Sequence, residues 1–399
     1  MRCSCYLPGL LSVLFLLSAL FSTSSLSADG VPALVCPGCS GPYLLENLAA
    51  DDSQTMPDKA APKPLTANDY DHANVMVVRR EDGTMQPVTT PLEMGQRRQH
   101  ILEGMSLAMG PLPSSDQRVP LDVEVISEEA ADGYIRKRIS FAPEANDRVP
   151  AWLLIPNGRT GKGSAMLCLH QTNNNGKGEP VGLGGLENLY YAHELAKRGF
   201  VCVVPDYPSF GDYRYDFKTQ GAHYVSGSMK AIWNNVRAID LLETLPEVDP
   251  ERIGCIGHSL GGHNTLFTAA FDVRIKAAVT SCGFTAFHDY YNGNLAGWTS
   301  DRYMPRIRDL YGNSPDRVPF DFHEVLAAIA PRSIFVNAPI SDNNFENSGV
   351  RKVVAEATKA QEIYAAAGGI ITARYPECGH DFPDDVREEA YQWLEERLK

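Results

Sequence analysis

The chain has 399 residues, of which 44% are hydrophobic and 21% are charged, as is typical of globular proteins. This composition excludes a wholly disordered, collagen-like or coiled-coil chain. The 36 Lys and Arg residues against 49 Asp and Glu residues give a net charge of −13, which argues against nucleic acid or an anionic membrane surface as a partner.

The N-terminal segment has the pattern of an export signal. Arg2 precedes a short apolar run from Gly9 to Phe21, and small and polar residues follow it up to Ala28. The run is shorter than the roughly 20 residues that span a bilayer. We therefore expect a signal peptide at residues 1–27, a secreted or periplasmic protein, and no stable membrane insertion after signal removal. The alternative is an uncleaved membrane anchor.

Residues 28–90 are rich in Pro, Ala, Asp and Thr and show little periodicity, which predicts an extended or poorly ordered N-terminal arm. Cys36 and Cys39 in this arm form a C-x-x-C without a second pair, which favours a local disulfide or two free thiols over a zinc site. Four further cysteines lie in or beside apolar runs and are expected to be buried: Cys168, Cys202, Cys255 and Cys282.

Residues 91–399 have the pattern of one large domain. It begins with a helix at 91–109 that Gly110-Pro111 ends. Three strands follow at 121–125, 134–141 and 149–155, the last two as a hairpin.

From residue 164 onward, continuous apolar runs alternate with helical segments. The expected strands are 165–169, 200–204, 253–256, 275–279, 333–336 and 369–372. The expected helices are 186–197, 225–245, 260–270, 351–367 and 384–398. Apolar runs separated by helices predict an α/β fold with a mostly parallel, doubly wound sheet flanked by helices. Residues 284–331 interrupt the alternation and are expected to form an inserted, lid-like segment.

The sequence GHSLG at residues 257–261 lies between an expected strand and an expected helix. This is G-x-S-x-G in the strand–turn–helix context that exposes a serine hydroxyl at the carboxyl edge of a parallel sheet. The helix N-terminus behind the serine favours developing negative charge. The pattern predicts that Ser259 is a catalytic nucleophile.

A serine nucleophile needs a base, and in this architecture the chain order is serine, acid, histidine. His380 lies in a Gly-containing loop after the last expected strand and is the expected base. Asp342, in the loop after the preceding strand, is the expected acid that orients the imidazole. Asp289, one strand earlier, is the alternative acid. Asp381 is expected to cap the last helix.

The oxyanion of an acyl-transfer intermediate needs two hydrogen-bond donors. The backbone N–H of Leu260, directly after the nucleophile, is one expected donor. Gln171, in the polar loop after the strand 165–169, is the other by its position. The alternative for that Asn-rich loop is a solvated turn.

The sequence predicts no metal and no cofactor, since it lacks H-E-x-x-H, a second C-x-x-C and a G-x-G-x-x-G that opens a βαβ unit. The insertion carries three arginines that meet an acidic substrate group or are plain surface charges: Arg302, Arg306 and Arg308. It also carries aromatic residues that line a sugar cleft or pack the insertion: Tyr290, Tyr291 and Trp298.

From about residue 121 to the C-terminus, the GHSLGG unit, the Asp342 loop and the CGHDF loop resemble the α/β-hydrolase superfamily. They are most similar to its dienelactone hydrolase-like and acetyl xylan esterase-like branch of exported bacterial proteins. The resemblance implies a triad of Ser259, Asp342 and His380 with Leu260 and Gln171 at the oxyanion hole. The chain departs from dienelactone hydrolases, whose nucleophile is cysteine. It also lacks a GCSRxG-type elbow, which argues against a glucuronoyl esterase.

These features predict a secreted serine hydrolase that cleaves a carboxylic ester, on a small molecule or a carbohydrate, through an acyl-enzyme. One alternative is a prolyl-oligopeptidase-like serine peptidase, although the chain before residue 121 is too short for the propeller usual in such enzymes. The other is a non-catalytic binding protein on a hydrolase fold.

Overall fold

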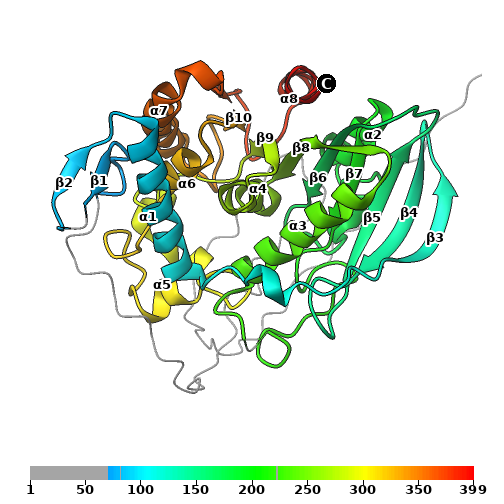
Figure 1. Cartoon of the computed structure of the whole chain (residues 1–399), viewed down its shortest axis with the longest axis horizontal. Coiled ribbons are helices and arrows are strands. Elements are labelled where there is room, and N and C mark those ends of the chain that lie inside the picture. The colour runs from blue at the N-terminus through cyan, green and yellow to red at the C-terminus, as the bar shows by residue number, and fades with distance from the viewer. Residues whose placement is uncertain (1–70, 81, 222) are drawn as a thin grey trace, which may run out of the picture. The chain divides into compact units, whose positions relative to one another are not determined.

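A computed structural model describes residues 71–80, 82–221 and 223–399 (Figure 1). The expected signal peptide, Cys36 and Cys39 lie outside the described residues. In chain order the first strands and helix are β1 (Val77–Arg79), β2 (Met85–Pro87), α1 (Pro91–Met109), β3 (Glu124–Ala130), β4 (Tyr134–Phe141), β5 (Val149–Pro156) and β6 (Gly163–Leu169). They are followed by α2 (Tyr191–Lys197), β7 (Val201–Pro205), α3 (Gly227–Thr244), β8 (Val248–His258), α4 (Leu260–Phe271) and β9 (Ile275–Ser281). The chain ends with α5 (Arg306–Asp309), α6 (Phe322–Ile329), β10 (Ser333–Asn337), α7 (Asn347–Ile363), β11 (Ile371–Arg374) and α8 (Asp384–Leu398).

Nine of the strands form one sheet in the order β11-β10-β9-β8-β6-β7-β5-β4-β3. The six from β11 to β7 pair in parallel, whereas β5, β4 and β3 are antiparallel to their neighbours. The predicted α/β fold with a mostly parallel sheet is confirmed. Because parallel strands share one direction, the carboxyl ends of β6, β8, β9 and β10 meet at the same edge.

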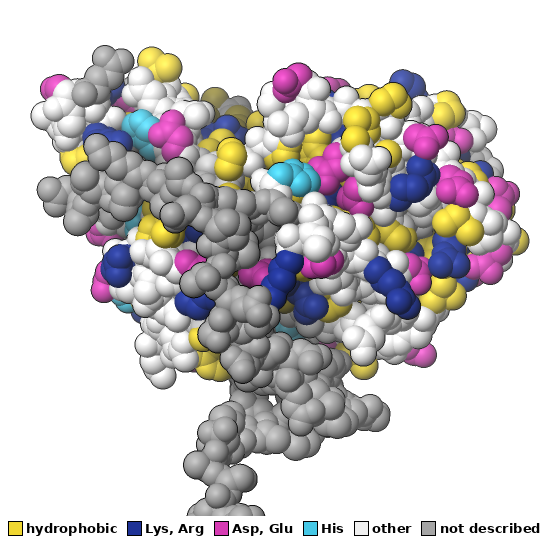
Figure 2. Space-filling view, turned by 90° about the horizontal axis from the view of Figure 1, so that it is seen from below, with side chains coloured by type: hydrophobic (Ala, Val, Ile, Leu, Met, Phe, Trp, Pro, Cys, Tyr) yellow, Lys and Arg dark blue, Asp and Glu magenta, His cyan; other side chains and the backbone are white. Residues whose placement is uncertain are grey.

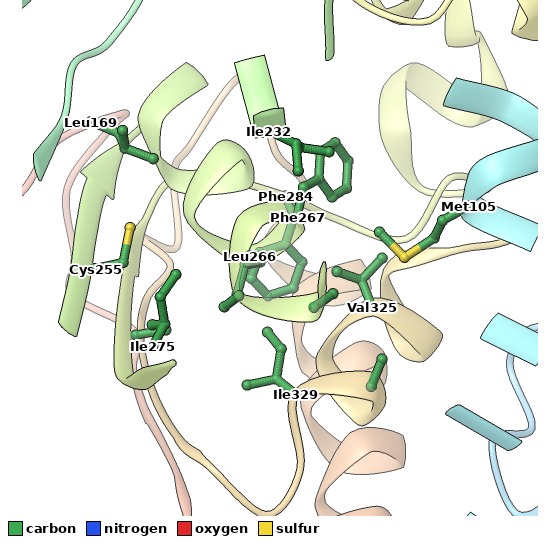
Figure 3. Packing of buried hydrophobic residues seen from close by; sticks show 14 of the residues in the cluster. Met105, Leu169, Ile232, Cys255, Leu266, Phe267, Ile275, Phe284, Val325 and Ile329 are labelled. Carbon is green, nitrogen blue, oxygen red and sulfur yellow. The ribbon is translucent and has the colours of Figure 1, made fainter. Parts of the chain in front are cut away.

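The strands bury side chains on both faces of the sheet. In β6, Leu167 joins a hydrophobic cluster with residues of α1, α3, α4, α6 and α7, while Met166 and Cys168 join a second cluster with residues of α2 and α8. Figure 3 shows the first cluster, in which Phe267 of α4 lies among residues from the sheet and from α6. Double-sided burial explains why these strands read as unbroken apolar runs.

Helix α1 has the bounds predicted from the sequence. Thr90 and Glu93 form a reciprocal capping box at its start, and such a box satisfies N–H groups that the first turn leaves free. Gly110 follows the helix at φ 92°, and a Cβ there would lie 2.7 Å from Cβ of Val225. Glycine is therefore needed where α1 ends against the segment before α3.

The insertion at residues 284–331 is packed into the main core. Its buried aromatic rings contact one another and α4: Phe322 stacks on Phe267 with centroids 5.6 Å apart, and Phe284 stacks on Phe322 at 5.3 Å. Helix α6 of the insertion is buried along its whole length. The segment thus forms a fixed wall of the domain. No helix among the described residues is both long enough and apolar enough to cross a bilayer.

Two local expectations were wrong. The composition of residues 77–87 predicts an extended or poorly ordered arm, but β1 and β2 pair there as an antiparallel hairpin, and Val75, Val78 and Val88 are buried in the core. These valines are too far apart in the sequence to show a strand or helix period, but they are nevertheless buried against α1. The strand expected at 121–125 is instead β3, which begins at Glu124. Because β3 is exposed along its whole length, its sequence carries no apolar pattern that marks its bounds.

Candidate active site

Ser259 lies on a strained turn between β8 and α4. Its backbone has φ 53° and ψ −116°, a conformation that costs a non-glycine residue free energy and is typical of nucleophile turns. A Cβ on Gly257 would lie 2.3 Å from the carbonyl of Gly261, and a Cβ on Gly261 would lie 1.9 Å from the Leu169 oxygen. Both glycines are therefore required for the close approach of strand and helix. The backbone N–H of Ser259 donates to the Ser281 oxygen at 2.8 Å, which ties the turn to β9.

His380 and Asp342 form an imidazole–carboxylate pair. His380 Nδ1 lies 3.0 Å from both carboxylate oxygens of Asp342. The Asp342 side chain is 1% exposed and the His380 side chain 24%. Asp342 Oδ1 also accepts the backbone N–H groups of Asn344 and Phe345, at 2.8 and 3.1 Å. The turn thus fixes the carboxylate, and the carboxylate fixes the imidazole.

Asp289, the alternative acid, faces a different element. Its carboxylate accepts Lys352 Nζ of α7 at 2.8 and 3.0 Å and Ser348 Oγ at 3.3 Å. Of the two candidate acids, only Asp342 is hydrogen-bonded to His380. The geometry therefore favours Asp342.

A buried polar network lies beneath His380, and the sequence reasoning missed it. Asn337 Nδ2 donates to Ser281 Oγ and to the Asp381 carbonyl, both at 2.8 Å. The Ser281 hydroxyl is then free to donate to His258 Nδ1, 2.8 Å away. The ring of His258 packs edge-on against that of His380 with centroids 4.9 Å apart. Burial lowers the pKa of His258 well below its usual range, which keeps this ring neutral.

One sequence signal could have revealed this network. His258, Ser281 and Asn337 are the last residues of β8, β9 and β10, and they are register partners across the sheet. Polar residues that end three adjacent parallel strands must meet at the carboxyl edge. Asp381, expected to cap α8, instead accepts Asn188 Nδ2 through its side chain. The helix begins after Pro383, which lacks a side-chain cap.

Cys282, Asp342 and His380 place one donor atom each within 4.8 Å of one another, the only such group of three found in the described part of the chain. Thiol, carboxylate and imidazole are ligands that zinc accepts. The bond between His380 and Asp342 already uses two of these groups, and Cys282 Sγ contacts the Asp381 carbonyl at 3.2 Å. Burial raises the pKa of the Cys282 thiol, which favours the protonated form rather than a thiolate ligand.

The two predicted oxyanion donors lie on neighbouring elements. Leu260 is the first residue of α4, and Gln171 follows β6, the strand beside β8. The Gln171 side chain donates to Glu179 at 2.9 Å, so it serves the loop rather than solvent. His170 Nε2 accepts the Tyr207 N–H at 2.9 Å, which fixes the loop from its other side. Because its side chain is engaged, the remaining donor of Gln171 is its backbone N–H.

Glu179 was not singled out from the sequence. It is buried and accepts hydrogen bonds from the side chains of Gln171 and Asn173 and from the Leu186 N–H. Burial raises the pKa of its carboxyl group. The carboxylate organises the polar loop that the sequence left open as a solvated turn.

The aromatic residues of the insertion have divided roles. Tyr290 and Trp298 are buried in the core, with ring centroids 5.6 Å apart, so they pack the insertion. Tyr291 is 49% exposed, and its hydroxyl donates to Asn344 Oδ1 at 3.2 Å in the Asp342 loop. Of the three, only Tyr291 presents a large exposed surface beside that loop.

Comparisons with known proteins find matches to carbohydrate esterases and to other hydrolases. A family model described as "Acetyl xylan esterase (AXE1)" matches residues 117–291, and one described as "Glucuronyl esterase, fungi" matches residues 215–368. YtaP of Bacillus subtilis (strain 168), a hydrolase by name, is 26% identical over 302 residues, 73% of this chain and 96% of YtaP. The 4-O-methyl-glucuronoyl methylesterase of Hypocrea jecorina (strain QM6a) is 29% identical over 164 residues, 37% of this chain and 35% of the methylesterase.

A solved structure agrees with these matches at the level of the fold. The glucuronoyl esterase from Solibacter usitatus superposes with a TM-score of 0.65 at 18% sequence identity, and the match covers 85% of this chain and 100% of that chain. At this identity the likeness concerns the fold alone.

Proposed function

Since the chain belongs to the α/β-hydrolase superfamily, in the family of acetyl xylan and glucuronoyl esterases, we propose that it is a secreted serine hydrolase that cleaves a carboxylic ester on a carbohydrate through an acyl-enzyme. The observation that carries the proposal is the His380–Asp342 pair at the sheet edge where the strained turn holds Ser259. The match to the acetyl xylan esterase model confirms the resemblance of the sequence to that branch. The fungal glucuronyl esterase model matches across the GHSLG turn, so the prediction against glucuronoyl esterases from the missing GCSRxG pattern was wrong at the level of the family.

The proposed reaction has two halves. His380 Nε2 removes the proton of the Ser259 hydroxyl as its oxygen attacks the ester carbonyl, and Asp342 stabilises the imidazolium that forms. The N–H groups of Leu260 and Gln171 donate to the oxyanion. Collapse of the intermediate transfers the proton from His380 to the alcohol, which leaves. His380 then takes a proton from a water molecule as the water oxygen attacks the acyl-serine carbonyl. The second intermediate collapses when His380 returns this proton to Ser259 Oγ, and the acid leaves.

The first test replaces the nucleophile. We expect Ser259→Ala to abolish turnover of p-nitrophenyl acetate, because loss of the serine from such a triad costs about 10⁶-fold in kcat. It should also abolish labelling by a fluorophosphonate probe. The matched control is Ser348→Ala, an exposed serine whose hydroxyl bonds to Asp289. Equal turnover by wild type and Ser259→Ala would refute the proposal.

The second test concerns the substrate. The purified protein is assayed on acetylated xylan oligosaccharides, on methyl esters of glucuronic acid and on aminoacyl-proline peptides. The proposal expects one of the carbohydrate esters to be cleaved with a kcat/KM above that of the peptide. Faster cleavage of the peptide would favour the peptidase, and labelling of Ser259 without turnover of either carbohydrate ester would contradict a carbohydrate ester as the substrate.

A further inference from the structure

The three arginines of the insertion lie in different environments. Arg306 donates to the Leu107 carbonyl at 2.8 Å, and Arg308 pairs with its neighbour Asp309 at 2.7 Å. Arg302 donates from Nε to Ser209 Oγ at 2.8 Å. It forms no ion pair with any carboxylate of the described residues. A guanidinium that keeps its charge and lacks an acidic partner is free to bind one.

The backbone that carries Arg302 is held rigidly. The Tyr207 hydroxyl donates to the Arg302 carbonyl at 2.6 Å. On either side, the Asp301 carbonyl accepts the Gly227 N–H at 2.9 Å and the Tyr303 carbonyl accepts the Ser228 N–H at 3.2 Å. The segment is thus fixed to the start of α3, and Arg302 does not need to be ordered when a ligand arrives.

The guanidinium of Arg302 lies beside the proposed site. Its Cζ is 4.3 Å from the ring centroid of Phe210, and that ring packs against His170 at 5.7 Å. One aromatic ring therefore separates Arg302 from the residue before Gln171. Tyr207 and Phe210 also form a small hydrophobic cluster with Leu260, the residue after the proposed nucleophile.

Arg302 carries a positive charge in a protein whose net charge is negative. The protein carries a net charge of −13, and acidic and basic side chains are interspersed over the face shown in Figure 2. A carboxylate substrate gains nothing from the overall charge, so its attraction must come from a local cation. Arg302, half-buried and stacked on Phe210, is such a cation at the site.

We propose that Arg302 binds a carboxylate carried by the ester substrate, separate from the ester that is cleaved. The two Nη groups would donate to the two carboxylate oxygens, and Phe210 would hold the guanidinium plane. The substrate class is therefore an ester with a free acidic group on its acyl or its alcohol part. This inference rests on the proposed function, because it assigns specificity to the same site.

The test compares acidic and neutral esters of matched size. On the acyl side the pair is 4-nitrophenyl hemiglutarate and 4-nitrophenyl pentanoate. On the alcohol side it is 4-acetoxybenzoate and its methyl ester. For each pair the specificity ratio is kcat/KM of the acidic ester divided by that of the neutral ester. Wild type, R302Q, R302K and the control R308Q are assayed at low and high salt.

We expect R302Q to lower the ratio by about tenfold or more in at least one pair, as for loss of a charge-assisted hydrogen bond. R302K should lie between, since it keeps the charge and loses the planar fork. R308Q should keep the wild-type ratio. The inference would be overturned if R302Q kept a specificity ratio within twofold of wild type in both pairs. An equal loss of kcat/KM on acidic and neutral esters would also overturn it, because such a loss indicates that Arg302 acts through packing alone.

Failure of the proposed function would be distinguishable. If wild type cleaves none of the four esters and also none of p-nitrophenyl acetate and the carbohydrate esters, the proposed function fails, and the carboxylate site is measured by calorimetric titration of D-glucuronate against D-glucose. Weaker glucuronate binding in R302Q than in R308Q, with no binding of glucose, would support the site. Equal binding of glucuronate by the two variants, or none by wild type, would overturn it.

Discussion

The replacement Asp342→Asn tests the acid of the proposed triad with little disturbance to the fold. The two loop N–H groups, of Asn344 and Phe345, both donate to Asp342 Oδ1, at 2.8 and 3.1 Å. An asparagine keeps one oxygen for these groups and so turns its NH₂ group toward His380. An NH₂ donor forces His380 Nδ1 to accept, which moves the ring proton to Nε2. Nε2 then cannot take the serine proton.

The expected loss follows from that tautomer. In a triad the same change lowers kcat by about 10⁴-fold while the geometry stays intact. The turn keeps its backbone hydrogen bonds, so Tm should change by only a few degrees. The assay is kcat for p-nitrophenyl acetate at several pH values, with the thermal unfolding of each variant measured in parallel.

Asp289→Asn is the matched control. It weakens a contact with Lys352, whose side chain is 62% exposed, and such surface ion pairs contribute about 0–1 kcal/mol. We expect its kcat to stay within about twofold of wild type. Loss of activity in Asp289→Asn with retention in Asp342→Asn would move the acid one strand earlier. Retention in both would refute the reasoning for an aspartate at either position.

Two further predictions concern stability. Phe267→Ala should lower the free energy of unfolding, measured in urea, by about 3–5 kcal/mol, because the ring is 1% exposed and stacks on Phe322. The control Leu92→Ala, at a side chain that is 75% exposed, should leave the free energy of unfolding nearly unchanged. Equal losses in the two variants would contradict the packing argument. Burial lowers the pKa of His72, but attraction to Glu324, 2.8 Å away, the hydrogen bond to it and attraction to Asp321 together raise the pKa above 6.5. Its stabilisation is complete below about pH 6.5 and is lost as pH rises through the raised pKa, so His72→Gln should destabilise the protein more at pH 6 than at pH 9, and equal effects would refute this.

Local signals in the sequence were sufficient for much of the fold. Helices α1 and α8 have the predicted bounds, because a cap or proline marks the start of each and Gly110 marks the end of α1. The predicted bounds of strands β6, β7 and β10 lie within two residues of those observed, since burial on both faces makes each an unbroken apolar run. Where burial is one-sided or absent, as in β1 and β3, composition carried no such signal.

The site itself was only half accessible from the sequence. The residues proposed for chemistry stand at fixed places in the chain order, so Ser259 and His380 could be named from their motifs and loops alone. Their supports could not, because Glu179, Ser281 and Asn337 are ordinary polar residues whose roles depend on what lies opposite them. Such contacts arise only when the register between strands is known.

The hydrogen bonds around the site distinguish its amide groups from the charged side chain of Arg302. Two buried amide groups near the Ser259 turn donate within the protein: the Gln171 side chain to Glu179, and Asn337 Nδ2 to the Asp381 carbonyl. Leaving such groups unpaired would cost about 1–3 kcal/mol each, so their pairing keeps the site rigid and gives a ligand little to bind. Arg302 differs from these amide groups because it carries a charge: it is fixed through its backbone and stacked on Phe210, and it has no acidic partner among the described residues. The rigid groups should therefore set kcat, and Arg302 should set which esters are bound. Substitution of Glu179 should lower kcat for all esters. Substitution of Arg302 should instead change the order of the esters by kcat/KM.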